Sequence, residues 1–338
     1  MTAFNPGGTG APLGQGPSEF SPILYTDADL EASALKPIGQ LELYWRRFRT
    51  HRLALVGLGV ITLLVLMAIF APLITPGQTA TTQHVTGPEA LPFGAGNPPT
   101  LANFPWRLFG TTSSTDDLQR SVLAEVTYGA RISLFIGFVG ALLTSALGTI
   151  VGAISGYFGG WIDNLMMRIT DVFLALPFLP LVIAISSFYQ TTGDNTFLII
   201  GILVVVSWPA SARLVRSLYL TLRESEFVEA ARAVGVNQWR IIFRHVLPNA
   251  LSPIVVVTTL NVAVFIILEA TLDFLGLGIH FPPTASWGNT LTASQGVIPL
   301  GIWWWPLFPG MFLVITVLAI NFVGDGLRDA LDVRSRVE

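Results

Sequence analysis

The stretch Arg223–Asn249 reads RESEFVEAARAVGVNQWRIIFRHVLPN and is a polar, helix-forming island inside a very apolar chain. Three alanines within four positions favour a first helix over residues 222–234, and Gly235 suits a left-handed cap after it. Asn237 can cap a second helix, which should stop just before Pro248 because residues that precede proline avoid the helical region. The stretch therefore predicts two short helices broken at Gly235.

The second of these helices should be amphipathic. Its apolar side chains recur at i, i+3, i+4 and i+7, which predicts one apolar face made by Trp239, Ile242, Phe243 and Val246. Arg240 and Arg244 fall on a polar side. Two interpretations follow: a solvated loop whose arginines lie near lipid headgroups, or a docking element for a partner protein. Composition alone leaves both open.

The rest of the chain has the composition of an integral membrane protein. Of 338 residues, 52% are hydrophobic and 12% are charged, whereas soluble domains carry about 25% charged residues. The mean hydropathy is +0.64. The apolar runs are continuous and far longer than the ~10 residues of a membrane β-strand, so the spans should be helical. We therefore expect an all-α integral membrane protein.

Several kinds of chemistry are excluded by residue usage. The chain has no cysteine, which removes disulfides, thiolate metal sites and cysteine nucleophiles. Lys36 is its one lysine and lies in no GxxxxGK[ST] loop, so the chain cannot bind a nucleotide through a P-loop. If ATP drives this protein, another chain binds the ATP. The net charge of −3 gives no indication of nucleic-acid binding.

Six apolar segments are long enough to cross a membrane. They fall at residues 53–74, within 132–162, at 163–189, 196–212, 250–271 and 306–323. The glycines of the second segment permit close contact between helices: Gly137, Gly140, Gly148, Gly152 and Gly156. Gly156–Gly160 should make the turn to the third segment, which Pro177 and Pro180 should kink.

The segments between and around the spans complete the predicted organisation. Residues 1–40 should form a disordered tail, and residues 41–74 a basic, aromatic interfacial segment with the first span. Residues 75–127 should form a loop with an amphipathic helix, capped by Thr115 and extending to Arg131 with an apolar stripe at Leu118, Val122 and Val126. Residues 128–326 should be a five-helix core that contains the loop 223–248, and residues 327–338 a polar tail. Trp303–Trp305 suit a membrane-interface belt.

The distribution of positive charge predicts the orientation. Six spans place both termini, the turn after the second span and the 223–248 loop on one side. That side carries fifteen of the eighteen lysines and arginines, and the other side carries Arg107, Arg120 and Arg131. Positive loops stay inside, so both termini and the 223–248 loop should be cytoplasmic, with residues 75–127 outside.

The spacing within the 223–248 loop resembles a known signature. Glu229-Ala230-Ala231, followed after three intervening residues by Gly235 and later by Leu247-Pro248, is similar to the EAA motif of bacterial importer permeases of the ATP-binding-cassette (ABC) class. The resemblance implies that this loop is a coupling helix that docks in a cleft of an ATPase subunit through Glu229, Ala230, Ala231, Arg232, Gly235, Leu247 and Pro248. The motif has a histidine, His245, two positions before Leu247, and this variant resembles the peptide and nickel importer branch.

Other blocks extend the resemblance from residue 41 to the C-terminus. They resemble the C-type permease of dipeptide, oligopeptide and nickel importers, which has one extra N-terminal span: residues 128–134, 156–160, 269–270, 274–278 and 286–288. The implied fold is a MetI-like, type I importer core. Gln119-Arg120-Ser121 departs from the family's Gly-Arg-Asp, and the loop 78–106 is longer and richer in proline. Both departures bear on which substrate is transported, and not on the class of protein that the chain resembles.

Charges inside membrane segments are rare and often functional. Glu269 and Asp273 lie four residues apart near the outer end of the fifth span and could line a cavity or gate that meets the substrate, as could the kink at Pro177. The alternative is a helix end that reaches water or bonds a neighbouring span. Asp171 is expected to pair with Arg168 or with a partner permease. No histidine, aspartate and glutamate residues have metal-ligand spacing.

The resemblance implies a permease subunit that performs no covalent chemistry and holds no cofactor, ATP and magnesium being bound by partner chains. Its implied partners are a homologous permease, two ATP-binding subunits, an extracytoplasmic substrate-binding protein and membrane lipid. Its location would be a bacterial or archaeal cytoplasmic membrane, and its cargo di- or oligopeptides, nickel or related solutes. The alternative is a self-contained secondary transporter or channel, which would need coupling charges at mid-membrane.

Overall fold

The computed structural model describes residues 40–82, 84–85, 97–100, 108–112, 118–188, 195–281 and 283–331. The chain divides into two units, residues 1–43 and 44–338. In the first, the described part is the beginning of helix α2 (Gln40–Phe48). The expected tail 1–40 otherwise lies outside the described residues, as do Thr115 and residues 332–338 of the expected C-terminal tail. Everything below concerns the second unit.

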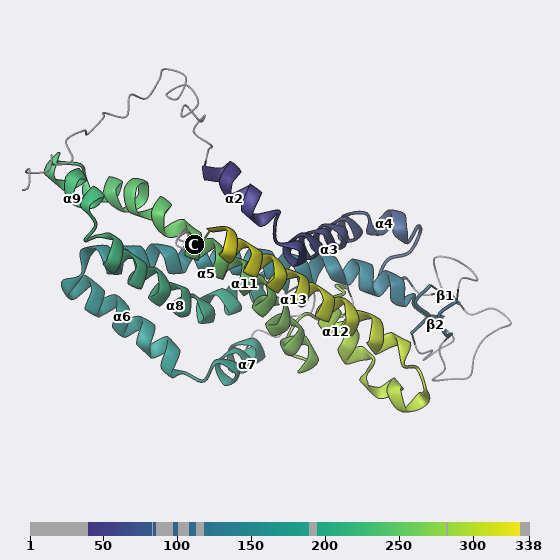
Figure 1. Cartoon of the computed structure of the whole chain (residues 1–338). Coiled ribbons are helices and arrows are strands. Elements are labelled where there is room, and N and C mark those ends of the chain that lie inside the picture. The colour runs from purple at the N-terminus through teal and green to yellow at the C-terminus, as the bar shows by residue number, and fades with distance from the viewer. Residues whose placement is uncertain are drawn as a thin grey trace, which may run out of the picture. The chain divides into compact units, whose positions relative to one another are not determined.

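Long apolar helices dominate the described residues (Figure 1). Five of them can each cross a membrane: α3 (Arg52–Ile69), α5 (Val122–Phe158), α8 (Thr196–Leu222), α11 (Leu247–Phe274) and α13 (Trp304–Leu331). The pair α6 (Gly160–Ala175) and α7 (Phe178–Phe188) is a sixth candidate span, broken where the two helices meet at an angle of 83°. The expected all-helical membrane fold is confirmed, with Pro177 at the break.

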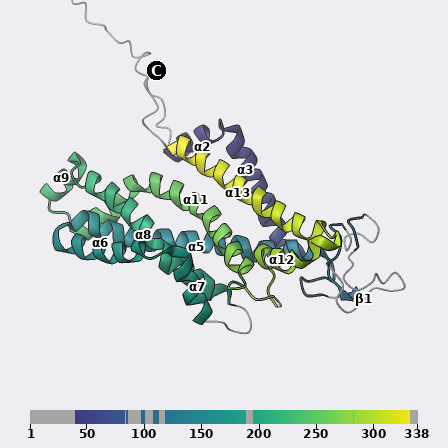
Figure 2. The ribbon, with the colours of Figure 1, turned by 90° about the horizontal axis from the view of Figure 1, so that it is seen from below.

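Short elements connect the long helices. They are α4 (Ala71–Ile74), α9 (Glu226–Ala233), α10 (Gln238–Arg240), the π-helix η1 (Ile241–Val246), α12 (Trp287–Ala293) and the 3₁₀ helix η2 (Gln295–Leu300). Strands β1 (His84–Val85) and β2 (Leu118–Gln119) pair antiparallel, with His84 opposite Gln119. In Figure 2, α9 and α12 lie at opposite ends of the helices that connect them.

Contacts between helix ends fix the direction of each span. His51 at the start of α3 lies 3.6 Å from the Asp329 carboxylate near the end of α13. At the opposite end, Arg131 of α5 donates hydrogen bonds to the carbonyl oxygens of Ala68 and Ile69, at 2.5 and 2.9 Å. Arg131 thereby satisfies carbonyl groups that the end of α3 leaves free. The start of α3 and the end of α13 therefore share one end of the bundle.

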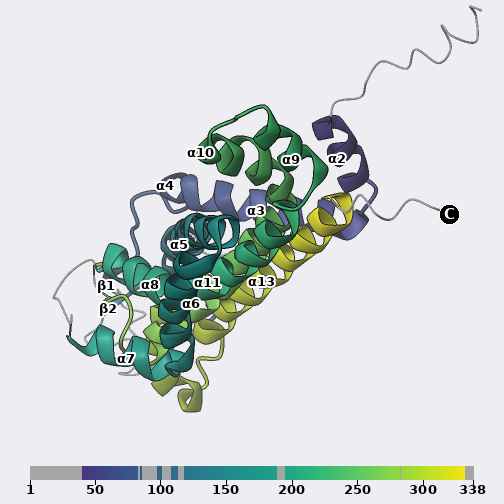
Figure 3. The ribbon, with the colours of Figure 1, turned by 90° about the vertical axis from the view of Figure 1, so that its left-hand side faces the viewer.

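Helix α5 lies in the middle of the bundle because its glycines admit neighbouring backbones, as predicted. Gly137 and Gly140 face Ile266 and Phe265 of α11. The other three glycines of the series face α8, with Gly152 the most enclosed. A Cβ atom on Gly152 would lie 2.8 Å from Val215 Cβ and 2.9 Å from the backbone nitrogen of Arg216. Figure 3 shows α5 and α8 running side by side.

We expect Gly152→Ala to lower the stability of the folded chain by about 1–3 kcal/mol, because the new methyl group meets backbone that cannot move aside. The check is the midpoint of heat-induced loss of the monodisperse peak in detergent. Gly201 of α8 is the matched control, since a Cβ atom there meets nothing within 4 Å. Gly201→Ala should be neutral or stabilising, because alanine favours helix. Equal midpoints for the two variants would contradict this account.

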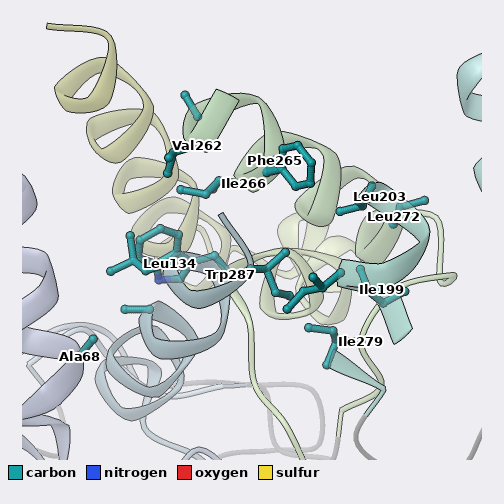
Figure 4. Close-up of a cluster of buried hydrophobic side chains, with 14 of the residues drawn as sticks. Ala68, Leu134, Ile199, Leu203, Val262, Phe265, Ile266, Leu272, Ile279 and Trp287 are labelled. Atoms are coloured by element: carbon teal, nitrogen blue, oxygen red, sulfur yellow. The ribbon is translucent and has the colours of Figure 1, made fainter. Parts of the chain in front are cut away.

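The main core lies where α5, α8 and α11 meet α12. Figure 4 shows Leu134 of α5, Val262 and Ile266 of α11 and Trp287 of α12 gathered in it. Trp287 is fully buried and donates its indole N–H to the Val126 carbonyl oxygen at 3.0 Å. A second cluster lies beside α9, and a third joins α3 to α13.

Two predicted boundaries are wrong for identifiable reasons. The amphipathic helix and the second span are one helix, which begins at Val122 because Ser121 caps it by accepting from the Ala124 N–H; Leu118 lies instead in β2. The helix of the fourth span continues past residue 212 to Leu222. Arg213 lies in this extension and pairs with the carboxylate of Asp171 at 2.5 Å. This ion pair allows the helix to continue through a charged position. Asp171 therefore pairs with Arg213 and not with Arg168, the partner within this chain that was expected.

The tryptophan triplet is also only partly as predicted. Trp303 is 56% exposed and suits a membrane-interface belt, whereas Trp304 and Trp305 are buried. Trp304 donates its indole N–H to the Thr111 carbonyl oxygen at 3.0 Å, and Trp305 donates to the Glu125 carboxylate at 2.9 Å. These two rings are buried because the fold offers an acceptor for each indole N–H.

Candidate functional site

The helix that carries the alanine motif ends in a defined reversal. Helix α9 stops at Ala233, and Gly235 has φ +78°, so the predicted left-handed cap is confirmed. The N–H of Gly235 bonds the Arg232 carbonyl oxygen at 2.9 Å, and the N–H of Val236 bonds that of Ala231 at 3.1 Å. This pair of bonds is a Schellman motif, whose left-handed position favours glycine because it has no Cβ atom.

Buried side chains fix this loop to the ends of α5 and α8. Val228 of α9 and Ile242 of η1 are fully buried, and they pack in one cluster with Tyr157 of α5 and with Val215 and Tyr219 of α8. The Tyr219 hydroxyl also donates to the Ile242 carbonyl oxygen at 3.2 Å. The loop is therefore anchored to the ends of α5 and α8.

The opposite face of the loop is exposed, and the residues predicted for docking divide between the two faces. The exposed ones are Glu229, Ala230, Arg232, Gly235 and Pro248. Among the exposed residues, Arg232 lies over the Tyr157 ring of α5, with its guanidinium carbon 5.3 Å from the ring centroid. Ala231 and Leu247 are half-buried and pack against the cluster that contains Val228 and Tyr219. Val234 at the tip is 84% exposed, and Phe227 is 41% exposed. We call Phe227, Ala230, Val234 and Gly235 the loop face.

The second helix of the loop differs from its prediction. Ile242 and Val246 are buried, but Trp239 and Phe243 are 51% and 42% exposed and stack on each other with ring centroids 6.1 Å apart. Ile241 is buried in their place. The four predicted positions do not share one face because residues 241–246 form a π-helical turn, whose repeat is wider than 3.6 residues.

The same π-helical turn explains why the second helix does not end before Pro248, where the sequence predicted that it would. Proline within a helix lacks an N–H and crowds the carbonyl group four residues earlier. In η1 the Leu247 N–H bonds the Ile242 carbonyl oxygen, five residues back, which widens the turn before Pro248. The Asn249 side chain then donates to the His245 carbonyl oxygen at 2.7 Å. The second half of the loop, α10 and η1, is consequently continuous with α11.

An ion pair that the sequence did not reveal stabilises the spans beneath the loop. Arg216 of α8 binds both carboxylate oxygens of Asp163 in α6, at 2.5 and 2.6 Å, and the Ser155 hydroxyl of α5 donates to the same carboxylate. Bidentate arginine–carboxylate pairs combine strength with a fixed geometry. The partner of Asp163 is 53 residues away in the sequence, and no local signal identifies it.

Glu269 and Asp273 lie at the other end of α11, and both are buried. Ser133 of α5 donates to Glu269 Oε2 at 3.1 Å. The Ile279 N–H donates to Asp273 Oδ1 at 2.5 Å, and the Ser286 hydroxyl donates to Asp273 Oδ2. We call these five residues the carboxylate cluster. It joins α5, α11 and the segment that leads into α12.

Glycines close the packing around this cluster. A Cβ atom on Gly278 would overlap the Asp273 carboxylate, and one on Gly288 would lie 2.7 Å from Asp273 Cβ. A Cβ atom on Gly129 would lie 3.0 Å from the Ser286 carbonyl carbon. Blocks of sequence that were noted separately therefore converge here, and their arrangement is that of tight interhelical packing.

A cavity of about 510 Å³ lies between the broken span, α8 and α11. Leu174 and Phe178, on the two sides of Pro177, line it, but Glu269 and Asp273 do not. Pro177 itself is exposed at the bend. The structure thus places one of the three residues predicted for a substrate path beside a cavity, and the other two in a packed interface. Among the described residues, no group of histidine, aspartate and glutamate side chains could hold a metal ion.

Comparisons with known proteins give consistent matches. Residues 148–337 match the family model of the binding-protein-dependent transport system inner membrane component. Residues 39–89 match the N-terminal TM domain of oligopeptide transport permease C.

The chain is similar to individual proteins over most of its length. It is 41% identical over 291 residues to the dipeptide transport system permease protein DppC of Alkalihalophilus pseudofirmus, covering 85% of this chain and 88% of that protein. It is 39% identical over 318 residues to the oligopeptide transport system permease protein OppC of Bacillus subtilis, covering 94% and 97%. Among solved structures, an inward-facing methionine ABC transporter, MetNI, aligns with a TM-score of 0.46 and 20% identity, covering 61% of this chain and 96% of that one.

Proposed function

The chain belongs to the family of inner-membrane components of binding-protein-dependent transport systems, and from this membership we propose that it forms half of a translocation path for di- and oligopeptides. It is a multi-pass permease subunit of an ABC transporter and is not itself a catalyst. Other components of the transporter, among them the ATPase, supply ATP hydrolysis. Relatives named as dipeptide and oligopeptide permeases support the choice of peptide over nickel as cargo.

The loop face is the observation that best supports a coupling role. Its exposed apolar side chains have no partner among the described residues, yet the helix beneath them is fixed to α5 and α8 by Val228 and Tyr219. A helix that is rigid on one side and open on the other can transmit the closure of a docked protein. In our proposal Glu229, Ala230, Arg232 and Gly235 contact an ATP-binding subunit, while Ala231 and Leu247 hold the loop on the permease.

The remaining components follow from this arrangement. A homologous permease would form the other half of the path, two ATP-binding subunits would take the two loops, and a substrate-binding protein would deliver peptide at the end that carries α12. We propose that the end with α9, the start of α3 and the end of α13 is cytoplasmic. The sequence assigns fifteen of the eighteen lysines and arginines to this side, and such an excess of positive charge supports the orientation.

Isolation of the native complex tests the proposal. An affinity tag on this permease should co-purify ATP-binding chains in fixed ratio, and the complex in proteoliposomes should take up radiolabelled alanyl-alanine only with ATP and a binding protein present. The control omits the binding protein. If no ATPase co-purifies and uptake follows an ion gradient instead, the chain is a self-contained transporter and the proposal is wrong.

A further inference from the structure

We call the cavity between α8 and α11 the α8–α11 cavity. The proposed function assigns no role to the residues of α8 and α11 that line it. The cavity is bounded by the broken span on one side and by facing turns of the two helices on the other. The lining residues from the helices are Val206, Ser207, Ala210, Ser211 and Leu214 of α8 and Val257, Asn261, Val264, Phe265 and Leu268 of α11. Its volume of about 510 Å³ is within the usual ~300–1,000 Å³ of sites for small ligands.

The three polar side chains of this lining, Ser207, Ser211 and Asn261, form no hydrogen bond within the part of the chain that the structure describes. The Ser207 hydroxyl is fully buried without a partner, whereas Asn261 is half-buried. Other polar side chains on these spans bond back to the carbonyl group four residues earlier: Thr258 to Ile254, and Asn321 of α13 to Val317 at 2.9 Å. The Asn261 amide can therefore pair with water or with a polar ligand that enters the cavity, because an amide buried there without a hydrogen bond would be costly.

The cavity lining carries no charged residue. Asp171 and Arg213, which precede the lining residues Leu174 and Leu214 on their helices, pair with each other at 2.5 Å. A site with neutral donors, neutral acceptors and apolar walls matches an amide group flanked by side chains of any kind. The lining has no charged side chain that could bind a metal cation or the charged termini of a peptide.

The bend between α6 and α7 supports placing the cavity on the path rather than against lipid. Leu174 and Phe178 contribute to the lining on either side of Pro177, where the span bends by 83°. Irregular backbone at membrane depth occurs where it is buried in protein or lines a water-filled cavity, because lipid cannot satisfy its polar groups.

We propose that the α8–α11 cavity contacts the main chain of the transported peptide, with the Asn261 amide and the Ser207 hydroxyl pairing with peptide N–H and C=O groups. This inference rests on the proposed function and names the part of the peptide that the permease recognises. Contact with the main chain alone accepts many sequences. It is also weak enough to release the cargo, which a conducting site requires.

The transport test compares Asn261→Leu with Asn321→Leu in the complete transporter in proteoliposomes, with radiolabelled alanyl-alanine as the probe. Loss of one or two neutral hydrogen bonds should lower the uptake rate by about three- to tenfold in Asn261→Leu. Asn321→Leu, whose wild-type amide bonds its own helix, should remain near wild type. Asn261→Gln should restore part of the uptake, and basal ATP hydrolysis should persist in all three variants, which shows that they fold and assemble.

Access to the cavity provides a second readout, because the chain has no native cysteine. Asn261→Cys should react with a polar maleimide, and excess alanyl-alanine with ATP should slow the reaction. Val205→Cys is the control, since Val205 is 49% exposed on α8 but does not line the cavity; it should stay unlabelled if it faces lipid.

Two results would overturn the inference. Normal peptide uptake by Asn261→Leu together with an unreactive Asn261→Cys would mean that a helix of the partner permease covers the cavity. A wild-type transporter that hydrolyses ATP but takes up no peptide would overturn the peptide assignment itself, and the inference with it. The two failures are distinguishable because the first leaves wild-type uptake intact.

Discussion

Gly235→Asp should reduce ATP-driven peptide uptake by roughly 30-fold or more, which corresponds to about 2 kcal/mol lost at a docking hot spot. Two effects add. At φ +78° a residue with a Cβ atom is strained by roughly 1–2 kcal/mol, and the new carboxylate projects from the loop face beside Val234, which is 84% exposed. The tagged variant should also retain less ATPase on purification than the wild type does. Uptake and the amount of bound ATPase measure the effect.

Gly77→Asp is the matched control for this substitution. Gly77 has φ +70°, and like Gly235 it is exposed, so that a Cβ atom at either position would meet nothing within 4 Å. The backbone strain is therefore the same, but Gly77 follows α4 at the other end of the bundle, away from the loop face. Gly77→Asp should transport normally. Equal loss in both variants would show that strain alone is responsible and that the loop face is not a docking surface.

Asp273→Ala should destabilise the folded permease by roughly 3 kcal/mol or more, the largest effect that we expect from a single polar side chain in this protein. The substitution leaves two buried donors without acceptors, the Ile279 N–H and the Ser286 hydroxyl. Because these groups position the segment before α12, the helix should detach from α11. The measurement is the midpoint of heat-induced loss of the monodisperse peak in detergent, together with the yield of folded protein.

Asp329→Ala provides the comparison for a surface carboxylate. The Asp329 side chain is 69% exposed and lies 3.6 Å from the His51 ring, and exposed pairs of this kind contribute about 0–1 kcal/mol. Its midpoint should stay close to that of the wild type. If Asp273→Ala were as stable as Asp329→Ala but defective in uptake, the carboxylate cluster would act on substrate and the structural account would be wrong.

The local features of the loop could be predicted from sequence because they depend on neighbouring residues. Alanine content, the missing Cβ atom of Gly235 and the capping side chain of Asn237 act within one helical turn, and the structure has the left-handed glycine and the Asn237 cap where they were expected. The π-helical turn before Pro248 was missed, since it arises from burial of Ile241 and Ile242 against α5 and α8.

By itself, the sequence determined that the protein is helical and spans a membrane, because a long run of apolar residues can satisfy its backbone in lipid only as a helix. It also determined which glycines of α5 allow close packing. Only the tertiary structure decided which polar groups meet: Asp163 with Arg216, Asp171 with Arg213, and Asp273 with Ser286. It also left Asn261 facing a cavity while Asn321 bonds its own helix. Composition cannot distinguish these two asparagines, because the free energy of a buried polar group depends on the partner that the fold brings to it.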